Sequence, residues 1–228
     1  MAAPPPSTDD AAVDLAPFDT GRFRWWARLI RFLGHLLCRT DCRPDRVPDT
    51  DGRPIVLVAN HRSLADVFVS VDALGRFDLP TRCLVRATYF ERRGLGRWLR
   101  WLGCIPAGDG RGGSFAAAAE TLAAGHPVAI MVEGRITPPD QRDEDGLGEF
   151  RPGFVAIARE ADAAIVPIAI VGTDEVWPSR ATLPRLPWRG RPTVHVHVLE
   201  PILIGDRTDD EVMAATRKAM AAEIAAIG

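Results

Sequence analysis

The chain has 228 residues, of which 46% are hydrophobic and 25% are charged, and its formal net charge is -2. This balance allows a sizeable buried core, and it lacks the strongly basic charge of a nucleic-acid-binding protein. The four cysteines (Cys38, Cys42, Cys83 and Cys104) are too scattered for a disulfide framework or a zinc motif, so we expect reduced, buried thiols.

Residues 1–20 combine prolines, alanines and scattered acids, which predicts a flexible tail. This segment has neither the basic start nor the apolar centre of a signal peptide. Elsewhere in the chain no apolar run approaches the roughly 20 residues that span a bilayer. We therefore expect a protein that does not cross a membrane by a standard helix.

A basic, tryptophan-bearing helix is predicted over residues 22–39. Its basic side chains recur every three or four residues and form one stripe: Arg24, Arg28, Arg31 and His35. Apolar side chains form the opposite stripe: Trp26, Leu29, Ile30, Leu33 and Leu37. This pattern is typical of a helix lying in a membrane interface, although a helix packing its apolar stripe on the core would also fit. We assign residues 21–53 to this amphipathic helix and a connector.

Short apolar runs and helical segments alternate along the rest of the chain. Strands are predicted over residues 54–59, 81–85, 104–107, 128–132, 165–171 and 193–199. Helices are predicted over residues 64–74, 95–102, 114–125 and 154–161, and a last helix after a capping box of Thr208 and Glu211. This order predicts an α/β fold, with a single domain over residues 54–228 and a largely parallel mixed sheet flanked by helices.

The first chemical motif follows the strand at residues 54–59. Asn60 and His61 stand at its carboxyl end, where open α/β sheets place their sites, and Asp66 comes five residues after His61. A helix turn can bring Asp66 to one imidazole nitrogen, which fixes the tautomer and leaves the other nitrogen free to accept a proton. Without a serine or cysteine elbow, this dyad suits direct attack by a substrate hydroxyl. A structural histidine at a turn is the alternative.

A second motif, Glu133-Gly134-Arg135, ends the strand at residues 128–132. An arginine beside a sharp glycine turn can bind a phosphate bidentately. An ordinary surface ion pair is the alternative, and it would contribute little.

Together these motifs resemble the glycerolipid acyltransferases, whose best-known members are the 1-acylglycerol-3-phosphate acyltransferases. The resemblance spans about residues 55 to 175 and consists of four blocks in the expected order. The blocks are Asn60-His61-x4-Asp66, residues 94–111, Glu133-Gly134 with Phe150-Arg151-Pro152-Gly153-Phe154 after it, and the proline-containing strand Ile165-Val166-Pro167-Ile168-Ala169.

The resemblance implies an acyltransferase domain in which His61 is the base and Asp66 its partner. It implies transfer of a fatty acyl group from acyl-CoA or acyl-carrier protein to a lysophospholipid hydroxyl, with 1-acyl-sn-glycerol-3-phosphate as the expected acceptor. The reaction needs no metal or prosthetic group. Candidate substrate-binding residues are Asn60, Arg86, Arg111, Glu133, Gly134 and Arg135. The expected location is the cytoplasmic face of the cell membrane, with an anionic membrane surface as partner and no nucleic acid.

Departures from the family pattern concern the positions expected to meet the acceptor phosphate. Arg135 comes one residue early, with Ile136 in the usual place of the arginine, and Asp109 stands where the second block has an arginine, two residues before Arg111. The glycine-rich residues 108–113 can bind a phosphate with Arg111 or form a plain surface turn. Alternatives are therefore another lipid acceptor (an ornithine lipid or glycolipid) and a non-catalytic lipid-binding relative, which the His61/Asp66 pair disfavours.

Two further pairs of side chains are weaker candidates. His195 and His197 alternate along a predicted strand and share one face, but no third ligand is apparent, so we expect no metal site. Trp177 and Trp188 can form a lip at the membrane interface or belong to a structural loop.

Overall fold

The computed structural model describes residues 15, 17–108, 113–188 and 190–228. Most of the predicted tail at residues 1–20 lies outside this description, as does Arg111 with residues 109–112 of the glycine-rich stretch.

A seven-stranded sheet forms the centre of the protein, in the order β1-β7-β6-β2-β5-β3-β4. Its strands are β1 (Arg39–Arg43), β2 (Ile55–Ala59), β3 (Arg82–Arg86), β4 (Ile105–Ala107), β5 (Val128–Met131), β6 (Ala164–Val171) and β7 (Thr193–Val198). Strands β2 to β6 run parallel to one another, whereas β7 is antiparallel to β6 and parallel to β1. The prediction of a largely parallel mixed sheet in an α/β domain is confirmed.

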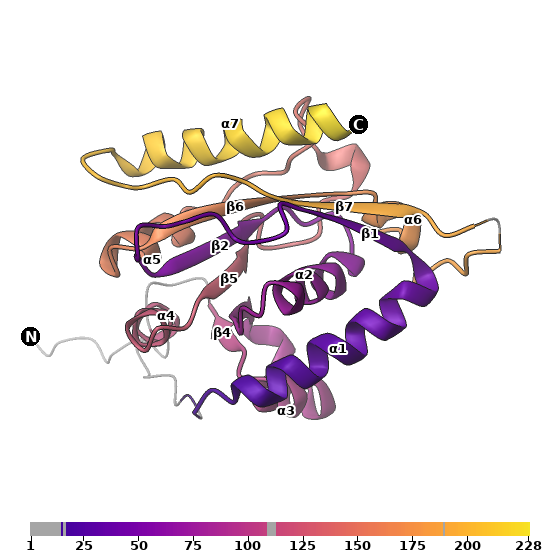
Figure 1. The fold of residues 1–228 in the computed structure, drawn as a ribbon, viewed down its shortest axis with the longest axis horizontal. Helices are drawn as coiled ribbons and strands as arrows, with labels where there is room; N and C mark the ends of the chain where they lie inside the picture. The colour runs from indigo at the N-terminus through magenta and orange to yellow at the C-terminus, as the bar shows by residue number, and fades with distance from the viewer. Residues whose placement is uncertain (1–14, 16, 109–112, 189) are drawn as a thin grey trace, which may run out of the picture.

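Helices cover both faces of the sheet (Figure 1). They are α1 (Thr20–Leu37), α2 (Ala65–Arg76), α3 (Arg93–Trp101), α4 (Gly113–Ala123), α5 (Gly153–Glu160), α6 (Thr173–Val176) and α7 (Asp209–Ile227). Helix α7 lies along one face, and α1 and α2 lie on the other (Figure 1). The predicted capping box of Thr208 and Glu211 begins α7.

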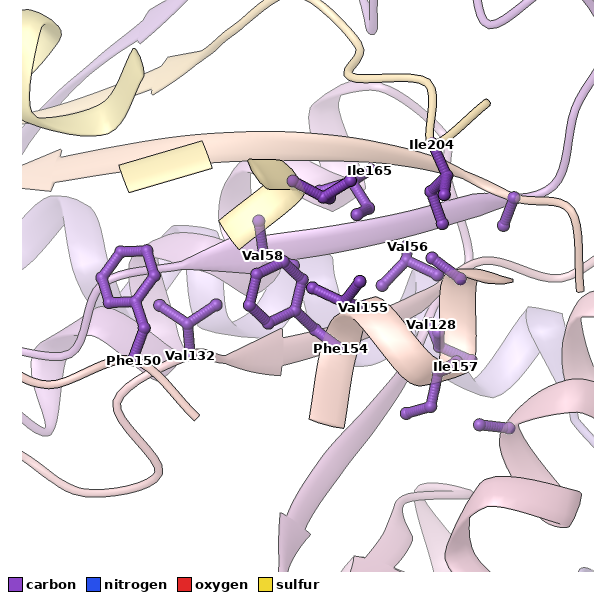
Figure 2. Packing of buried hydrophobic residues seen from close by; sticks show 14 of the residues in the cluster. Val56, Val58, Val128, Val132, Phe150, Phe154, Val155, Ile157, Ile165 and Ile204 are labelled. Atoms are coloured by element: carbon purple, nitrogen blue, oxygen red, sulfur yellow. The ribbon is translucent and has the colours of Figure 1, made fainter. Parts of the chain in front are cut away.

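The core consists of two apolar clusters, one on each face of the sheet. Because side chains alternate along a strand, Val56 and Val58 of β2 join one cluster and Leu57 and Ala59 join the other. Figure 2 shows Phe154 and Val155 of α5 among the side chains around β2. Strand β2 is thus buried on both faces, which explains its continuous apolar sequence.

Helix α1 packs on α2 with a different face from the one expected. Its buried residues are Phe23 and Ala27, and a Cβ added at Gly75 of α2 would lie 2.5 Å from that of Ala27. The basic stripe borders this contact, since Arg24 pairs with Asp78 at 2.5 Å and Arg31 approaches Asp72. Arg24 and Arg31 of the basic stripe therefore add ion pairs at the edge of this contact.

The side of α1 turned away from the protein is apolar. Phe32, Leu36, Trp25 and Leu33 are 67%, 58%, 55% and 49% exposed, respectively. Three of these four were not part of the predicted apolar stripe, whose Leu29, Ile30 and Leu37 are partly buried. Among the helices of the described residues, none is long and apolar enough to span a bilayer.

Residues 39–43, expected as part of a connector, form the edge strand β1. The segment Arg39-Thr40-Asp41-Cys42-Arg43 has no apolar alternation because an edge strand needs few buried side chains, so its sequence gives no strand signal. Its register against β7 places Asp41 beside His195 and Arg43 beside His197.

Candidate active site

His61 and Asp66 meet at the carboxyl end of β2, as their spacing predicts. The Nδ1 atom of His61 lies 2.9 Å from Oδ2 of Asp66. The same oxygen accepts hydrogen bonds from the backbone N–H groups of Arg62 (2.5 Å) and Ser63 (2.7 Å). Asp66 is fully buried, whereas the His61 side chain keeps 14% of its surface exposed. With Nδ1 occupied, Nε2 is the nitrogen left to meet a substrate.

Asn60 has a framework role in this structure. Its side chain is fully buried, its Nδ2 donates to the carbonyl of Ile170, and its Oδ1 accepts from the N–H of Ile170. Because both ends of the amide are used by β6, the side chain is not turned to a substrate. The substrate contact of Asn60 stays a prediction, and in this structure its amide joins the end of β2 to β6.

Glu133 is also turned inward. It is 3% exposed, its Oε1 accepts from the backbone N–H of His61 at 3.2 Å, and its Oε2 accepts from the hydroxyl of Thr137. A Cβ added at Gly148 would lie 2.8 Å from that second oxygen, so only glycine fits beside the carboxylate. Glu133 therefore holds the main chain of the proposed base in place and does not face the solvent side of the site.

Thr137 also holds the main chain of His61, through the carbonyl group of that residue. Its backbone N–H donates to the carbonyl of His61 at 2.8 Å. Its own carbonyl accepts from Nε of Arg142, which is paired through its other nitrogens with Asp174 of α6 at 2.9 Å. The backbone of His61 is thus held from both sides by the turn after β5.

The loop that follows is tied to α7. Arg217 makes paired contacts of 2.7 and 2.8 Å with Asp145, contacts Asp143 at 2.7 Å, and donates to the carbonyl of Gly148. Asp145 and its hydrogen bonds with this guanidinium raise the pKa of Arg217. The acidic loop is therefore anchored to α7. Through Gly148, it also forms part of the wall of the site.

The remaining predicted substrate-binding residues lie at the same edge of the sheet. Arg86 ends β3, and Gly134 and Arg135 follow β5, the strand between β3 and β2. Gly134 has φ +65°, a conformation that suits glycine in a sharp turn. Both arginines are exposed, and no ion-pair partner for either occurs within the described part of the chain. Arg111 lies outside the described residues, so its place is not part of this geometry.

Several framework residues were not singled out from the sequence: Thr137, Arg142, Gly148, Asp174 and Arg217. Their roles depend on backbone groups and on contacts between residues far apart in the sequence, as in Arg217 with Asp145, which are 72 positions apart. The sequence signal that could have found one of them is the threonine at the end of the Glu-Gly turn, four residues after Glu133.

An exposed apolar surface adjoins the dyad on α2. Leu64, Val67 and Phe68 are each more than 40% exposed, and their spacing puts them on one side of the helix start. The ring of Phe68 stacks on Trp177, with centroids 6.2 Å apart. The exposed apolar side chains therefore begin on both sides of Asp66 in the sequence, next to the dyad.

Glu133 gives a testable pH dependence. Burial raises the pKa of Glu133 above its ordinary value of 4.5, against the opposing effect of its hydrogen bonds with Thr137, His61 and Gly148. The folded protein therefore binds the proton more strongly than the unfolded chain, and this residue lowers stability as pH rises through the window that begins near 4.5. The variant Glu133→Gln lacks this titration.

We expect the free energy of unfolding of Glu133→Gln, relative to the wild type, to rise with pH across that window and then level off. Urea unfolding of both proteins at several pH values from 4 to 8 measures this difference. A difference that stays constant over the whole range would contradict the assignment.

Together, these observations describe an α/β domain with a histidine–aspartate pair at the carboxyl edge of a mostly parallel sheet. The Acyltransferase family profile matches residues 39–171, more than half of the sequence, and the chain belongs to this family. The resemblance found in the motifs is thereby confirmed.

Two known proteins are similar to this chain. A probable 1-acyl-sn-glycerol-3-phosphate acyltransferase of Mycoplasma genitalium is 30% identical over 127 residues, which cover 53% of this chain and 45% of that protein. The crystal structure of the 1-acyl-sn-glycerophosphate (LPA) acyltransferase PlsC from Thermotoga maritima matches with a TM-score of 0.70 at 18% identity, covering 91% of this chain and 79% of that one. At this identity the second match supports the fold.

Proposed function

We propose that this protein transfers a fatty acyl group from a thioester to the hydroxyl of a lysophospholipid, with 1-acyl-sn-glycerol-3-phosphate as the acceptor. The observation that carries the proposal is the dyad, in which Asp66 occupies Nδ1 of His61 and leaves Nε2 toward the site. Membership of the Acyltransferase family supports the reaction class, and the name of the Mycoplasma relative supports this acceptor.

In the proposed reaction, Nε2 of His61 takes the proton from the acceptor hydroxyl as its oxygen attacks the thioester carbonyl. The carbon–sulfur bond then breaks, the imidazolium returns the proton to the leaving thiolate, and an ester and a free thiol result. Asp66 holds the ring in the required tautomer and stabilises its cationic form. No prosthetic group is needed for these steps.

Direct attack by the acceptor is favoured over an acyl-enzyme on Ser63. The hydroxyl of Ser63 donates to the carbonyl of Trp177 at 2.5 Å and accepts from the N–H of Ala65 at 3.0 Å. Both contacts hold the start of α2, and they leave this hydroxyl no free proton for the imidazole. The nearby Thr137 hydroxyl is likewise committed to Glu133.

The two exposed arginines of the carboxyl edge, Arg86 and Arg135, are the proposed partners of the acceptor phosphate. Neither guanidinium is used by a carboxylate in the described part of the structure, so each can make charge-assisted bonds to a phosphate. Arg135 comes one residue before the usual position of the family's arginine. A different lipid acceptor, such as an ornithine lipid or a glycolipid, is therefore the second candidate.

We further propose that the protein works at a membrane surface. Support comes from the exposed apolar side of α1, the apolar start of α2, and the loop residues Leu183, Leu186 and Trp188, of which Trp188 is 87% exposed. The loop meets α1, since Arg191 donates to the carbonyl of His35. Because Arg24 and Arg31 of the basic stripe are paired with carboxylates of the same chain, apolar contact rather than attraction to anionic lipid is the main expected force.

Release of free thiol from a purified preparation tests the reaction. Palmitoyl-CoA and palmitoyl-carrier protein are each offered with no acceptor, with lysophosphatidic acid, with a lyso-ornithine lipid, or with a glycolipid. We expect thiol release that depends on lysophosphatidic acid, and the two donors decide which thioester is used. If thiol release depends only on another acceptor, that lipid is the substrate instead of the proposed one. If neither donor gives acceptor-dependent release, the proposed transfer is refuted.

A further inference from the structure

A second cluster of titratable side chains lies between β1, β7 and α7. Asp41 of β1 stands beside His195 of β7 in the sheet register, and His197 lies two residues further along the same strand. One ligand atom from each of the three side chains lies within 4.8 Å of the others. No third ligand for the two histidines could be predicted from the sequence, because the polar segment that forms β1 carries no strand signal.

The contacts within the cluster match the needs of a metal site. Oδ2 of Asp41 lies 3.3 Å from Nδ1 of His195. Two ligands of one tetrahedral zinc ion, with bonds of about 2.0–2.2 Å, are separated by roughly 3.4 Å. The histidine and carboxylate ligand types are those that zinc and its neighbours among the divalent transition metals prefer.

His197 supplies the second, independent observation. Its Nδ1 contacts Glu223 of α7 at 2.5 Å, which holds the ring and leaves its other nitrogen as the one available to an ion. That other nitrogen, Nε2, is buried and has no hydrogen-bond partner among the residues that the structure describes. A buried ring nitrogen without a partner is unfavourable, and a metal ion would satisfy it.

From these contacts we propose that Asp41, His195 and His197 bind one divalent transition-metal ion, with zinc as the fitting member of this class. Glu223 orients His197 from behind, and a water molecule completes the coordination. The ion joins the edge strand β1 to β7 and α7, so its role is structural and independent of the acyl-transfer reaction. The three ligand atoms must move closer together to bind one ion. Changes of side-chain rotamer allow this movement.

Arg43 is the competing partner of Asp41. Its guanidinium donates a hydrogen bond to the carboxylate at 3.1 Å, so a metal ion would have to displace this partner. Since the Arg43 side chain is 70% exposed, it can turn to solvent when an ion enters.

Zinc binding to the tag-free, chelator-treated full chain tests the proposal. Titration against a chromogenic zinc chelator should show one zinc ion per chain. The variants Asp41→Asn and His195→Gln should lose this binding, and Glu223→Gln should weaken it roughly 10- to 100-fold, as loss of a ligand-orienting partner does. Substitution of cobalt should give the visible absorption of a tetrahedral site.

Thermal unfolding provides a readout that does not depend on activity. Zinc at about 100 times its dissociation constant should raise the Tm of the wild type by roughly 5–10 °C and leave the Tm of Asp41→Asn unchanged. His126→Gln is the matched control and should bind zinc normally, as should His61→Ala. Absence of saturable zinc binding, binding that survives both ligand variants, or binding lost in His61→Ala would each overturn the proposal.

Discussion

Replacing His61 by alanine is expected to lower kcat for acyl transfer by on the order of 10²- to 10⁴-fold, the usual contribution of a positioned general base. The imidazole is held by Asp66 on its ring and by Glu133 and Thr137 on its main chain. The backbone contacts do not depend on the side chain, so His61→Ala should fold normally. Acceptor-dependent thiol release and thermal unfolding of the same preparation measure the two effects.

Asp66→Asn refines this test. An asparagine oxygen in the place of Oδ2 can still accept from Nδ1 of His61 and from the N–H groups of Arg62 and Ser63. The tautomer is then kept and the negative charge that stabilises the imidazolium is lost, so we expect kcat to fall, but by no more than in His61→Ala. His126→Ala, at the opposite end of the sheet beside β5, is the matched control. Full activity in His61→Ala would exclude the proposed base.

Placing two charges on the outer side of α1 should release the protein from vesicles. Phe32 and Leu36 are among the most exposed apolar side chains of this helix. Burying each such side chain contributes about 1.5–3 kcal/mol, so Phe32→Glu with Leu36→Glu should lower the vesicle partition coefficient at least ~100-fold. Sedimentation with vesicles of neutral and of anionic lipid measures this change, and thermal unfolding checks the fold.

Controls for this experiment separate apolar from electrostatic binding. Arg28 is an exposed basic residue of α1 without an ion pair in the described structure, so Arg28→Gln should weaken binding only on anionic vesicles, and by much less than the double variant does. Leu203→Glu introduces a charge at an exposed leucine outside α1 and should leave binding unchanged. Undiminished binding of the double variant would show that α1 is not the anchor. Deletion of the helix is a poorer test because Phe23 and Ala27 belong to the core.

The sequence predicted the elements whose signals are local. Strands buried on both faces, such as β2 and β6, are continuous apolar runs, and the dyad needs only a five-residue spacing across one turn. The sequence could not reveal which side of α1 faces inward, because its basic residues pair with Asp72 of α2 and with Asp78 in the turn after it. In the sequence, an acidic residue that contacts a substrate cannot be told from one that contacts a distant backbone N–H. Glu133 is of the second kind.

Arg217 connects the far C-terminal helix to the catalytic end of the sheet. It holds Asp145 and the carbonyl of Gly148, and Gly148 packs against the Glu133 carboxylate that holds the main chain of His61. Local opening of α7 would break this chain of contacts at its outer end. Hydrogen exchange at the amides of the turn after β5 should therefore follow the opening free energy of α7, so that the two segments form one cooperative unit although they lie more than 60 residues apart.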